Sequence, residues 1–260
     1  MANILMLSSA VTNAAVAIYA SRGMGAANLL THDLKEVWQD SAVGSIATIT
    51  IDLGAPKAIN TIALAAIYGA IANSSSWSIT GGIADSASIV IKADGYLPAV
   101  DAAGQNPNVS HALWTGAAVT VRYVSVNVWQ PSGNPALKIG RILVGDAFQP
   151  TWNQEWGGGR GVIDTGASTR LLSGGMAIVE GARLGTYAWT LGDLTDAEVE
   201  TLYALQLEVG ETLPVLVVED PAATTAQRNR IHYGRLVALR KFERRSPGRT
   251  RWELAMEEWI

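Results

Sequence analysis

The stretch from Ile46 to Ala66 constrains the fold of this 260-residue chain more than any other part of its sequence. In residues 46–53, apolar and polar side chains alternate, which is the pattern of a strand with one buried face. Gly54 and Pro56 follow and predict a turn, because glycine tolerates positive φ and proline fixes its own φ. Residues 59–66 are nearly all apolar, which indicates a strand covered on both faces. We therefore expect a half-exposed strand to lead through a turn into a core strand.

Short segments of the same kind recur along the first 147 residues, separated by Gly, Asn, Ser and Pro. The expected strands are 3–7, 46–53, 59–67, 77–80, 88–92, 119–129 and 139–144. Strands at this spacing, without helical periodicity between them, favour a β-sandwich or jelly roll. A change of phase in 119–128, near Arg122, predicts a β-bulge. Residues 94–114 are rich in Gly, Pro, Asn and Ala and predict a long surface loop.

A second domain is expected over residues 148–260, where charged residues are denser and all but one of the basic ones are arginine. Its expected strands are 162–164, 175–180, 185–191, 213–218, 231–242 and 251–259. One helix is predicted over 195–209, because Thr195 and Glu198 form a capping-box pattern and Gly210 suits the C-terminal cap. The predicted fold class is therefore mainly β: a jelly-roll sandwich over 1–147, then a β-sandwich with one α-helix.

Composition excludes several classes of function. The net charge of −4 and the pI of 5.4 give no basic field for nucleic acid. The chain has no cysteine, so disulfides and thiolate metal sites are excluded. No apolar run approaches the roughly 20 residues that span a bilayer. The N-terminal segment has no Lys or Arg before Arg22, so we expect no signal peptide and no membrane partner.

No pattern of catalysis or cofactor binding is present. The three histidines, His32, His111 and His232, have no metal spacing, and no serine stands in a Gly-x-Ser-x-Gly elbow. The segment from Gly23 has Asn28 where a dinucleotide fingerprint needs its third glycine. The glycines of 157–161 lack the lysine of a phosphate-binding loop. We therefore expect no enzyme, no catalytic residue and no cofactor.

Residues 1–147 resemble the galactose-binding-like jelly roll of discoidin and coagulation-factor type C domains. The segments that carry the resemblance are 27–30, Trp38, Ile49–Gly54, 59–64, 78–81, Val121–Val128 and Ile139–Val144. The two domain-closing cysteines of the family are absent. The resemblance implies a sandwich whose loops at one end bind a sugar, with aromatic faces stacked on the ring.

This resemblance implies a set of tentative carbohydrate-binding residues: His111, Trp114, Trp77, Tyr68 and Asn73. The alternative for Trp77, as for Trp38, is a place in the core. A calcium ion is common near the first loop of the family, and here Asp33 with the Leu30 carbonyl would contribute oxygen ligands. The alternative for Asp33 is the cap of a turn. Apart from this candidate, we expect no bound metal.

Residues 148–260 resemble the β-sandwich with one helix found in distal and minor tail proteins of long-tailed bacteriophages. The segments that carry this resemblance are 144–150, Thr169–Gly175, the helix after Leu194 and Trp252–Ile260. The resemblance implies a structural virion protein of the tail tip, made in the host cytoplasm. It would form a ring, a hexamer in preference to a trimer, and act as adaptor between the tail tube, tape-measure and hub proteins and the receptor-binding proteins, with weak binding to a host-surface glycan.

Arginines supply the expected oligomer or partner interface. The tentative residues are Arg240, Arg244, Arg245, Arg249, Arg160 and Trp156. The basic stretch 240–251 could contact a protein, form a solvated hairpin whose arginines pair with Glu253 and Glu257, or contact DNA without reading its sequence. Two alternative functions remain beside the virion protein: a stand-alone carbohydrate-binding module or adhesin, and a hydrolase.

Overall fold

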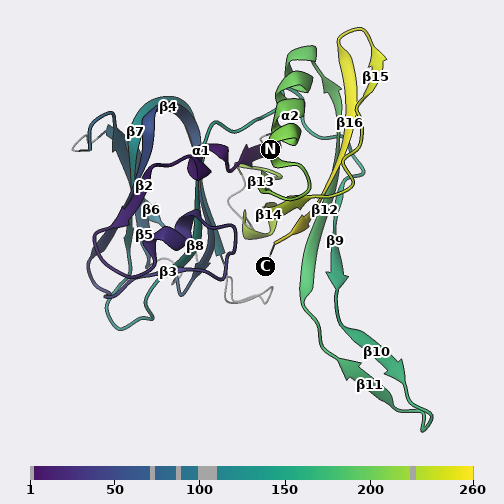
Figure 1. Cartoon of the computed structure of the whole chain (residues 1–260), viewed down its shortest axis with the longest axis horizontal. Helices are drawn as coiled ribbons and strands as arrows, with labels where there is room; N and C mark the ends of the chain where they lie inside the picture. Colours follow the sequence, from purple (N-terminus) through teal and green to yellow (C-terminus); the bar gives the residue numbers. More distant parts are fainter. Residues whose placement is uncertain (1–2, 71–73, 86–88, 99–109, 223–226, 260) are drawn as a thin grey trace. The chain divides into compact units, whose positions relative to one another are not determined.

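The computed structural model describes residues 3–70, 74–85, 89–98, 110–222 and 227–259 (Figure 1). The chain divides into two compact units. The first contains residues 1–149 and 215–231, and the second contains residues 150–214 and 232–260. The break at 149/150 lies beside the boundary expected at 147/148, and residues 215–231 return to the first unit. Each unit is described by itself below.

The first unit is an antiparallel β structure. Its main sheet has the strand order β3-β8-β4-β7-β5-β6, with β2 paired to β4. The strands are β2 (Ala17–Ala20), β3 (Trp38–Gln39), β4 (Ile46–Tyr68), β5 (Ser76–Gly82), β6 (Ile89–Tyr96), β7 (Ser110–Trp129) and β8 (Lys138–Gly145). The unit also holds the short helix α1 (Ala10–Asn13), the 3-10 turn η1 (Ala26–Leu30), the 3-10 turn η2 (Gln227–Arg230), and β1 (Leu5–Ser8) paired with β13 (Pro214–Val218).

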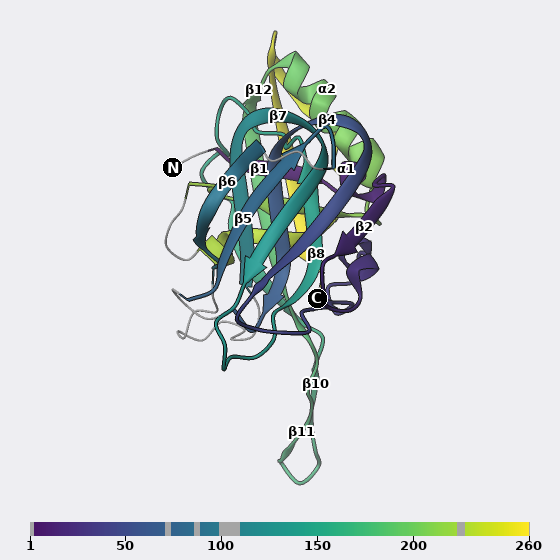
Figure 2. The same cartoon turned by 90° about the vertical axis from the view of Figure 1, so that its left-hand side faces the viewer.

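Two long strands, β4 and β7, bend and run through both layers of the sandwich (Figure 2). Their pairing is continuous apart from irregularities, one of which lies between Asp52 and Lys57. The chain bends where the turn was predicted, and Gly54 has φ +76° there. The predicted break into two strands is wrong, because β4 continues through a bulge as one strand. The phase change predicted near Arg122 lies opposite this bulge, on β7.

The core of this unit lies between the two layers. Alternate residues of each strand face inward, and the completely buried side chains include Trp38, Ile49, Ile62, Val126 and Ile142. The complementary positions carry hydroxyl and amide side chains that face outward. The predicted mainly β fold class, with a jelly-roll sandwich at the start of the chain, is confirmed.

An ion pair ties the two long strands together at the bend. The guanidinium of Arg122 donates to both carboxylate oxygens of Asp52 at 2.8 and 2.9 Å, and the Gly54 N–H donates to Asp52 Oδ1 at 2.8 Å. The Arg122 hydrogen bonds, helped by that of the Gly54 amide, lower the pKa of Asp52 from 3.8 to about 2. The charged carboxylate is therefore the form that the folded bend stabilises.

Asp52→Asn is expected to destabilise the first unit at neutral pH and to have little effect in strong acid. Because the pKa of Asp52 is lower in the folded protein, its contribution is complete above the unfolded value of 3.8 and disappears as the pH falls toward about 2. Chemical denaturation of both proteins at pH 7 and at a series of lower pH values measures this. A difference in stability that stayed constant down to the lowest pH would contradict the assignment.

The second unit is an antiparallel sheet with one face covered by a helix. Its strands are β9 (Gly159–Asp164), β12 (Arg183–Leu194), β14 (Ile231–Leu236, which begins at the boundary), β15 (Glu243–Ser246) and β16 (Arg249–Glu258). The order is β14-β16-β12-β9, with β15 paired to β16. The predicted helix is confirmed as α2 (Asp196–Val209), with the Thr195–Glu198 capping box formed and Val199, Leu202, Leu205 and Val209 buried.

A ribbon of two strands extends from this sheet. Strands β10 (Ala167–Arg170) and β11 (Met176–Val179) pair only with each other among the described residues, and they prolong β9 and β12 (Figures 1 and 2). All eight of their residues are exposed. In the described part of the chain, no helix has the length and apolar character needed to cross a membrane.

Candidate functional site

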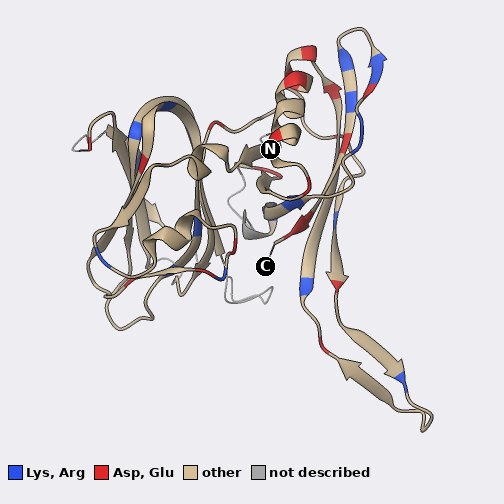
Figure 3. Cartoon of the chain, in the orientation of Figure 1, with Lys and Arg blue, Asp and Glu red and all other residues tan. Residues whose placement is uncertain are grey.

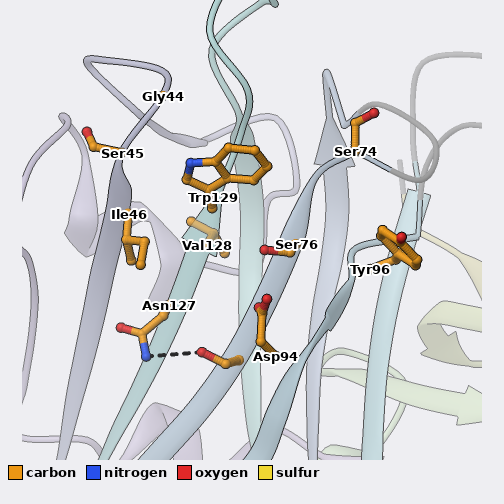
Figure 4. Close-up of a pocket in the computed structure, with 11 residues that line it drawn as sticks. Gly44, Ser45, Ile46, Ser74, Ser76, Asp94, Tyr96, Asn127, Val128 and Trp129 are labelled. Atoms are coloured by element: carbon orange, nitrogen blue, oxygen red, sulfur yellow. Dashed lines mark hydrogen bonds between the residues drawn. The ribbon is translucent and has the colours of Figure 1, made fainter.

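A groove of about 820 Å³ lies on the outer face of the jelly-roll unit, over strands β4, β7, β5 and β6 (Figure 4). It is open to solvent, and two of its large side chains, Ile46 and Tyr96, are exposed by 60% and 68%. Its described lining consists of Gly44, Ser45, Ile46, Ser74, Ser76, Ser78, Asp94, Tyr96, Asn127, Val128 and Trp129. Four serines thus stand among larger aromatic and aliphatic side chains in the described lining.

Strand register places two aromatic rings on either side of a serine. Ser76 on β5 lies directly opposite Trp129 on β7, and on its other side directly opposite Tyr96 on β6. Directly opposed residues on neighbouring strands share a face of the sheet. The backbones at Trp129 and Tyr96 are thus separated by two interstrand spacings, about 10 Å. This leaves an open floor at Ser76 between the two rings.

A second row of polar side chains runs parallel to the first. Asn127 lies opposite Thr48 on one side and Ser78 on the other. Thr48 Oγ1 donates to Asn127 Oδ1 at 2.8 Å. Asn127 Nδ2 donates to Ser78 Oγ at 3.4 Å, which is the dashed line in Figure 4. Asp94 reaches the same face from β6. The hydrogen bonds fix the orientation of the Asn127 amide, so the floor presents donors and acceptors at defined positions.

The floor is held in place by the core beneath it. Ala47, Val126 and Trp77 alternate with the lining residues along the same strands, and each is at most 2% exposed. Because successive side chains of a strand point to opposite faces, packing of these residues fixes the lining residues above them. The site therefore belongs to rigid strands.

This arrangement suits the recognition of a sugar. Trp and Tyr rings offer flat apolar faces with a polar edge, whereas Ser, Asn and Asp exchange hydrogen bonds with hydroxyl groups. A small set of placed polar groups beside aromatic surface is the usual make-up of a small-molecule site. Among the described lining residues Asp94 is the one carboxylate, whereas glycoside hydrolysis uses a pair. These side chains can hold a sugar by stacking and hydrogen bonding.

Four of the five sugar-binding residues expected from the sequence, Trp77, His111, Trp114 and Tyr68, are not among the described residues that line this groove. Trp77 is 2% exposed in the core, so its ring offers no face to a ligand. His111 and Trp114 lie within strand β7 and not in a loop, and the His111 Nδ1 accepts a hydrogen bond from the Ala66 N–H at 3.3 Å. Tyr68 is half-buried at the end of β4, where burial raises its pKa. Asn73 lies outside the described residues.

The structure gives Asp33 a role in a turn. Its Oδ1 accepts a hydrogen bond from the Lys35 N–H at 2.8 Å, and the Leu30 carbonyl accepts one from Arg141 at 3.2 Å. Within the described ranges, no group of three or more His, Asp or Glu side chains could hold a metal ion. Trp38 is completely buried, in agreement with its alternative as a core residue.

The expected interface residues are spread over the second unit. Basic residues gather along β15 and β16 (Figure 3). Arg240 pairs with Glu253, and Arg245 with Glu155, so these arginines already have partners within the unit. Arg244 and Arg249 are exposed on the β15–β16 hairpin, and Arg160 is exposed on β9. Trp156, in the loop before β9, is fully exposed.

The groove residues lie on strands, whereas the sugar-binding residues implied by the family resemblance belong to loops at one end of the sandwich. Trp129 and Ser76 each occupy an outward position of an alternating strand, and that alternation is visible in the sequence. Tyr96 could not be assigned in this way, because it falls in the stretch expected to begin a loop. Register between β5, β6 and β7 brings the three residues together.

No protein-family model matches the chain, and no curated protein does. Solved structures that it resembles include the CBM32 of AlyQ in complex with 4,5-unsaturated mannuronic acid, with 24% identity over 50% of this chain and 94% of that one and a TM-score of 0.37. Another is the family 32 carbohydrate-binding module of NanJ from C. perfringens in complex with galactose, with 14% identity, 55% and 99% coverage and a TM-score of 0.40. A third is a GH29 fucosidase of Ruminococcus gnavus, with 15% identity and a TM-score of 0.41 over 54% of this chain, which spans only 27% of the fucosidase.

Proposed function

We propose that this chain is a non-catalytic carbohydrate-binding protein and that its jelly-roll unit binds a glycan in the groove over β4, β7, β5 and β6. The observation that carries the proposal is the row formed by Trp129, Ser76 and Tyr96 across three adjacent strands. Each ring can support one face of a sugar, and the serines and Asn127 offer hydrogen bonds between them.

The balance of interactions favours a weak, specific site. Hydroxyl-rich ligands lose water on binding, so net hydrogen bonds contribute only about 0.5–1.5 kcal/mol each. Most of the affinity must therefore come from apolar surface covered on Trp129 and Tyr96, at about 25 cal/mol per Å². An open groove with two platforms fits an internal segment of a glycan chain as well as its end.

An array of immobilised oligosaccharides tests this proposal. The wild-type chain is expected to be retained on a subset of the glycans and to be released by the same oligosaccharide in solution. The Trp129→Ala variant, which lacks one platform, is the comparison. A wild-type chain that is retained on no glycan, or a variant that is retained equally well, would contradict the proposal.

A second function, suggested by the resemblance to phage tail proteins, is assembly into a ring at a tail tip, with contacts to tube, tape-measure and hub proteins. The observation that favours self-association is the ribbon β10–β11. Its β11 strand has the sequence Met-Ala-Ile-Val, its outer edge is unpaired among the described residues, and Met176, Ile178 and Val179 are 52–70% exposed. An exposed apolar edge strand readily pairs with another chain. Head-to-tail pairing of this kind gives a ring when the rotation closes.

Ile178→Lys is expected to lower the oligomeric state of the purified chain, because the substitution places a charge on the apolar edge of the ribbon. Light scattering coupled to size exclusion measures the mass, with a hexamer favoured over a trimer for the wild type. Ser168→Lys, on the β10 residue that pairs with Ile178, is the matched control. A wild-type chain that is monomeric at high concentration, or equal effects of the two lysines, would contradict the role of the β11 edge.

A further inference from the structure

We infer that the groove of the jelly-roll unit selects glycans that carry a free, protonated amine, and that the carboxylate of Asp94 makes this selection. The inference rests on the glycan-binding function proposed above and adds the class of ligand. It follows from the carboxylate of Asp94, which lines the groove, and from the nearby Lys92, which does not.

Asp94 is the one charged side chain in the described lining of the groove. It is exposed, and it lies two residues before the platform Tyr96 on the same strand. In Figure 4 its carboxylate points toward Ser76, the residue between the two aromatic rings. A ligand that covers the rings therefore passes over a fixed negative charge.

A shift in register turns the nearest lysine on the strand away from the groove. Gly95 lies opposite Trp77, whereas Lys92 lies opposite Ile79, so β6 has one extra residue between these pairs. Because of the extra residue, Lys92 faces the inner side with Ile79, although it is two residues from the outward Asp94. Its Nζ donates to the carbonyls of Trp77 and Ala93, both at 2.9 Å.

The other basic group beside the groove also has a partner. Arg22 contacts Ser45 on the far wall, and it pairs with Asp40 at 2.7 Å. Asp40 is almost completely buried, so this pair holds the guanidinium at the edge of the loop. Asp94 is the charged side chain that a ligand meets on the groove floor, and the Lys92 ammonium that interacts with its charge stays outside the described lining.

A carboxylate in this position distinguishes ligands by their charge. An ammonium group can form a charge-assisted hydrogen bond with Asp94, which is stronger than a neutral one. An acetylated amine loses the charge, and a uronate is repelled. Because Asp94 is exposed, the gain is modest and is screened by salt over about 10 Å at 0.1 M.

Calorimetric titration of the full chain with two matched probes tests the inference. The probes are a glucosamine oligosaccharide and the N-acetylglucosamine oligosaccharide of the same length, which differ only in acetylation. The wild type is expected to bind the amine form about 5-fold more tightly at low ionic strength, a ratio that falls as salt is added. Asp94→Asn is expected to abolish the ratio while the acetylated probe still binds. Asp146→Asn, on an exposed residue outside the groove, is expected to leave the ratio unchanged.

The outcomes separate this inference from the function on which it rests. Equal affinities for the two probes in the wild type, or a preference that survives in Asp94→Asn, would overturn the selection and leave glycan binding intact. Failure of both probes to bind, when other oligosaccharides on the array do, would also overturn the selection alone. Failure of every glycan to bind would overturn the proposed function and the inference together.

Discussion

Replacing Trp129 with alanine is expected to weaken glycan binding about 30-fold, which corresponds to about 2 kcal/mol. The ring of Trp129 forms one wall of the groove, and the adjacent Ser76 and Val128 cannot replace its flat surface. Tryptophan is enriched among residues whose truncation costs this much, because it combines a large apolar area with few rotatable bonds. Titration of a glycan retained on the array, into wild type and variant, measures the loss.

The control for this prediction is Trp152→Ala. Trp152 is 57% exposed and lies in the second unit, outside the groove, so its removal tests whether loss of any surface tryptophan lowers affinity. The thermal midpoint of Trp129→Ala should stay close to that of the wild type, since the buried core residues of the same strand, such as Val126, are unchanged. Equal loss of affinity in both variants would show that the groove does not hold the sugar.

Replacing Trp38 with alanine is expected to destabilise the first unit by about 3–5 kcal/mol. The side chain is completely buried against the core, and its Nε1–H donates to the Arg22 carbonyl at 3.2 Å. Its removal leaves a large cavity and a carbonyl without this donor. Scanning calorimetry should show a fall of roughly 10 °C in the transition of this unit.

Trp152→Ala serves as the control here too. Substitutions of exposed residues, away from the core and from buried hydrogen bonds, usually change stability by less than about 0.5 kcal/mol. A change below about 1 kcal/mol for Trp38→Ala would contradict the place of this residue in the core. Affinity measured on the remaining folded protein should be unaffected, since Trp38 does not line the groove.

The layers of the jelly roll could be predicted from local sequence because alternation reports burial directly. Ile49 and Ile51 stand on one side of the alternation in 46–53, and both are completely buried. The helix α2 could also be predicted, because its capping box and its C-terminal glycine are local signals. The buried side of these strands and the ends of α2 depend on residues close in sequence, so they can be predicted without knowing which strands pair.

The bend of β4 and the place of His111 could not be predicted in the same way. Gly54 and Pro56 are typical of a turn, yet pairing with β7 on both sides of the bulge keeps β4 as one strand. His111 was expected at the end of a loop, whereas its backbone joins β7 two residues before Leu113, which pairs with Ala63. Long-range pairing therefore overrode the local turn and loop preferences.

The groove depends on register, which the sequence does not state. Trp129, Ser76 and Tyr96 are far apart along the chain, and they become neighbours only through the pairing of β7, β5 and β6. The extra residue of β6 between Lys92 and Gly95 places Asp94, and not Lys92, on the groove face. It can be recognised only from the pairing of β6 with β5. If β6 paired with β5 one residue out of this register, Asp94 would face inward and Lys92 would face outward.

The most direct test of glycan binding in this groove is the NMR spectrum of the tryptophan indole N–H groups during a titration with a glycan that the array retains. The chain has nine tryptophans, and the signal of Trp129 is identified by its absence in Trp129→Ala. The groove predicts that this signal shifts with the ligand while the signals of the buried Trp38 and Trp77 stay in place. A titration in which Trp129 does not move, and in which Trp114 or a tryptophan of the second unit moves instead, would contradict it.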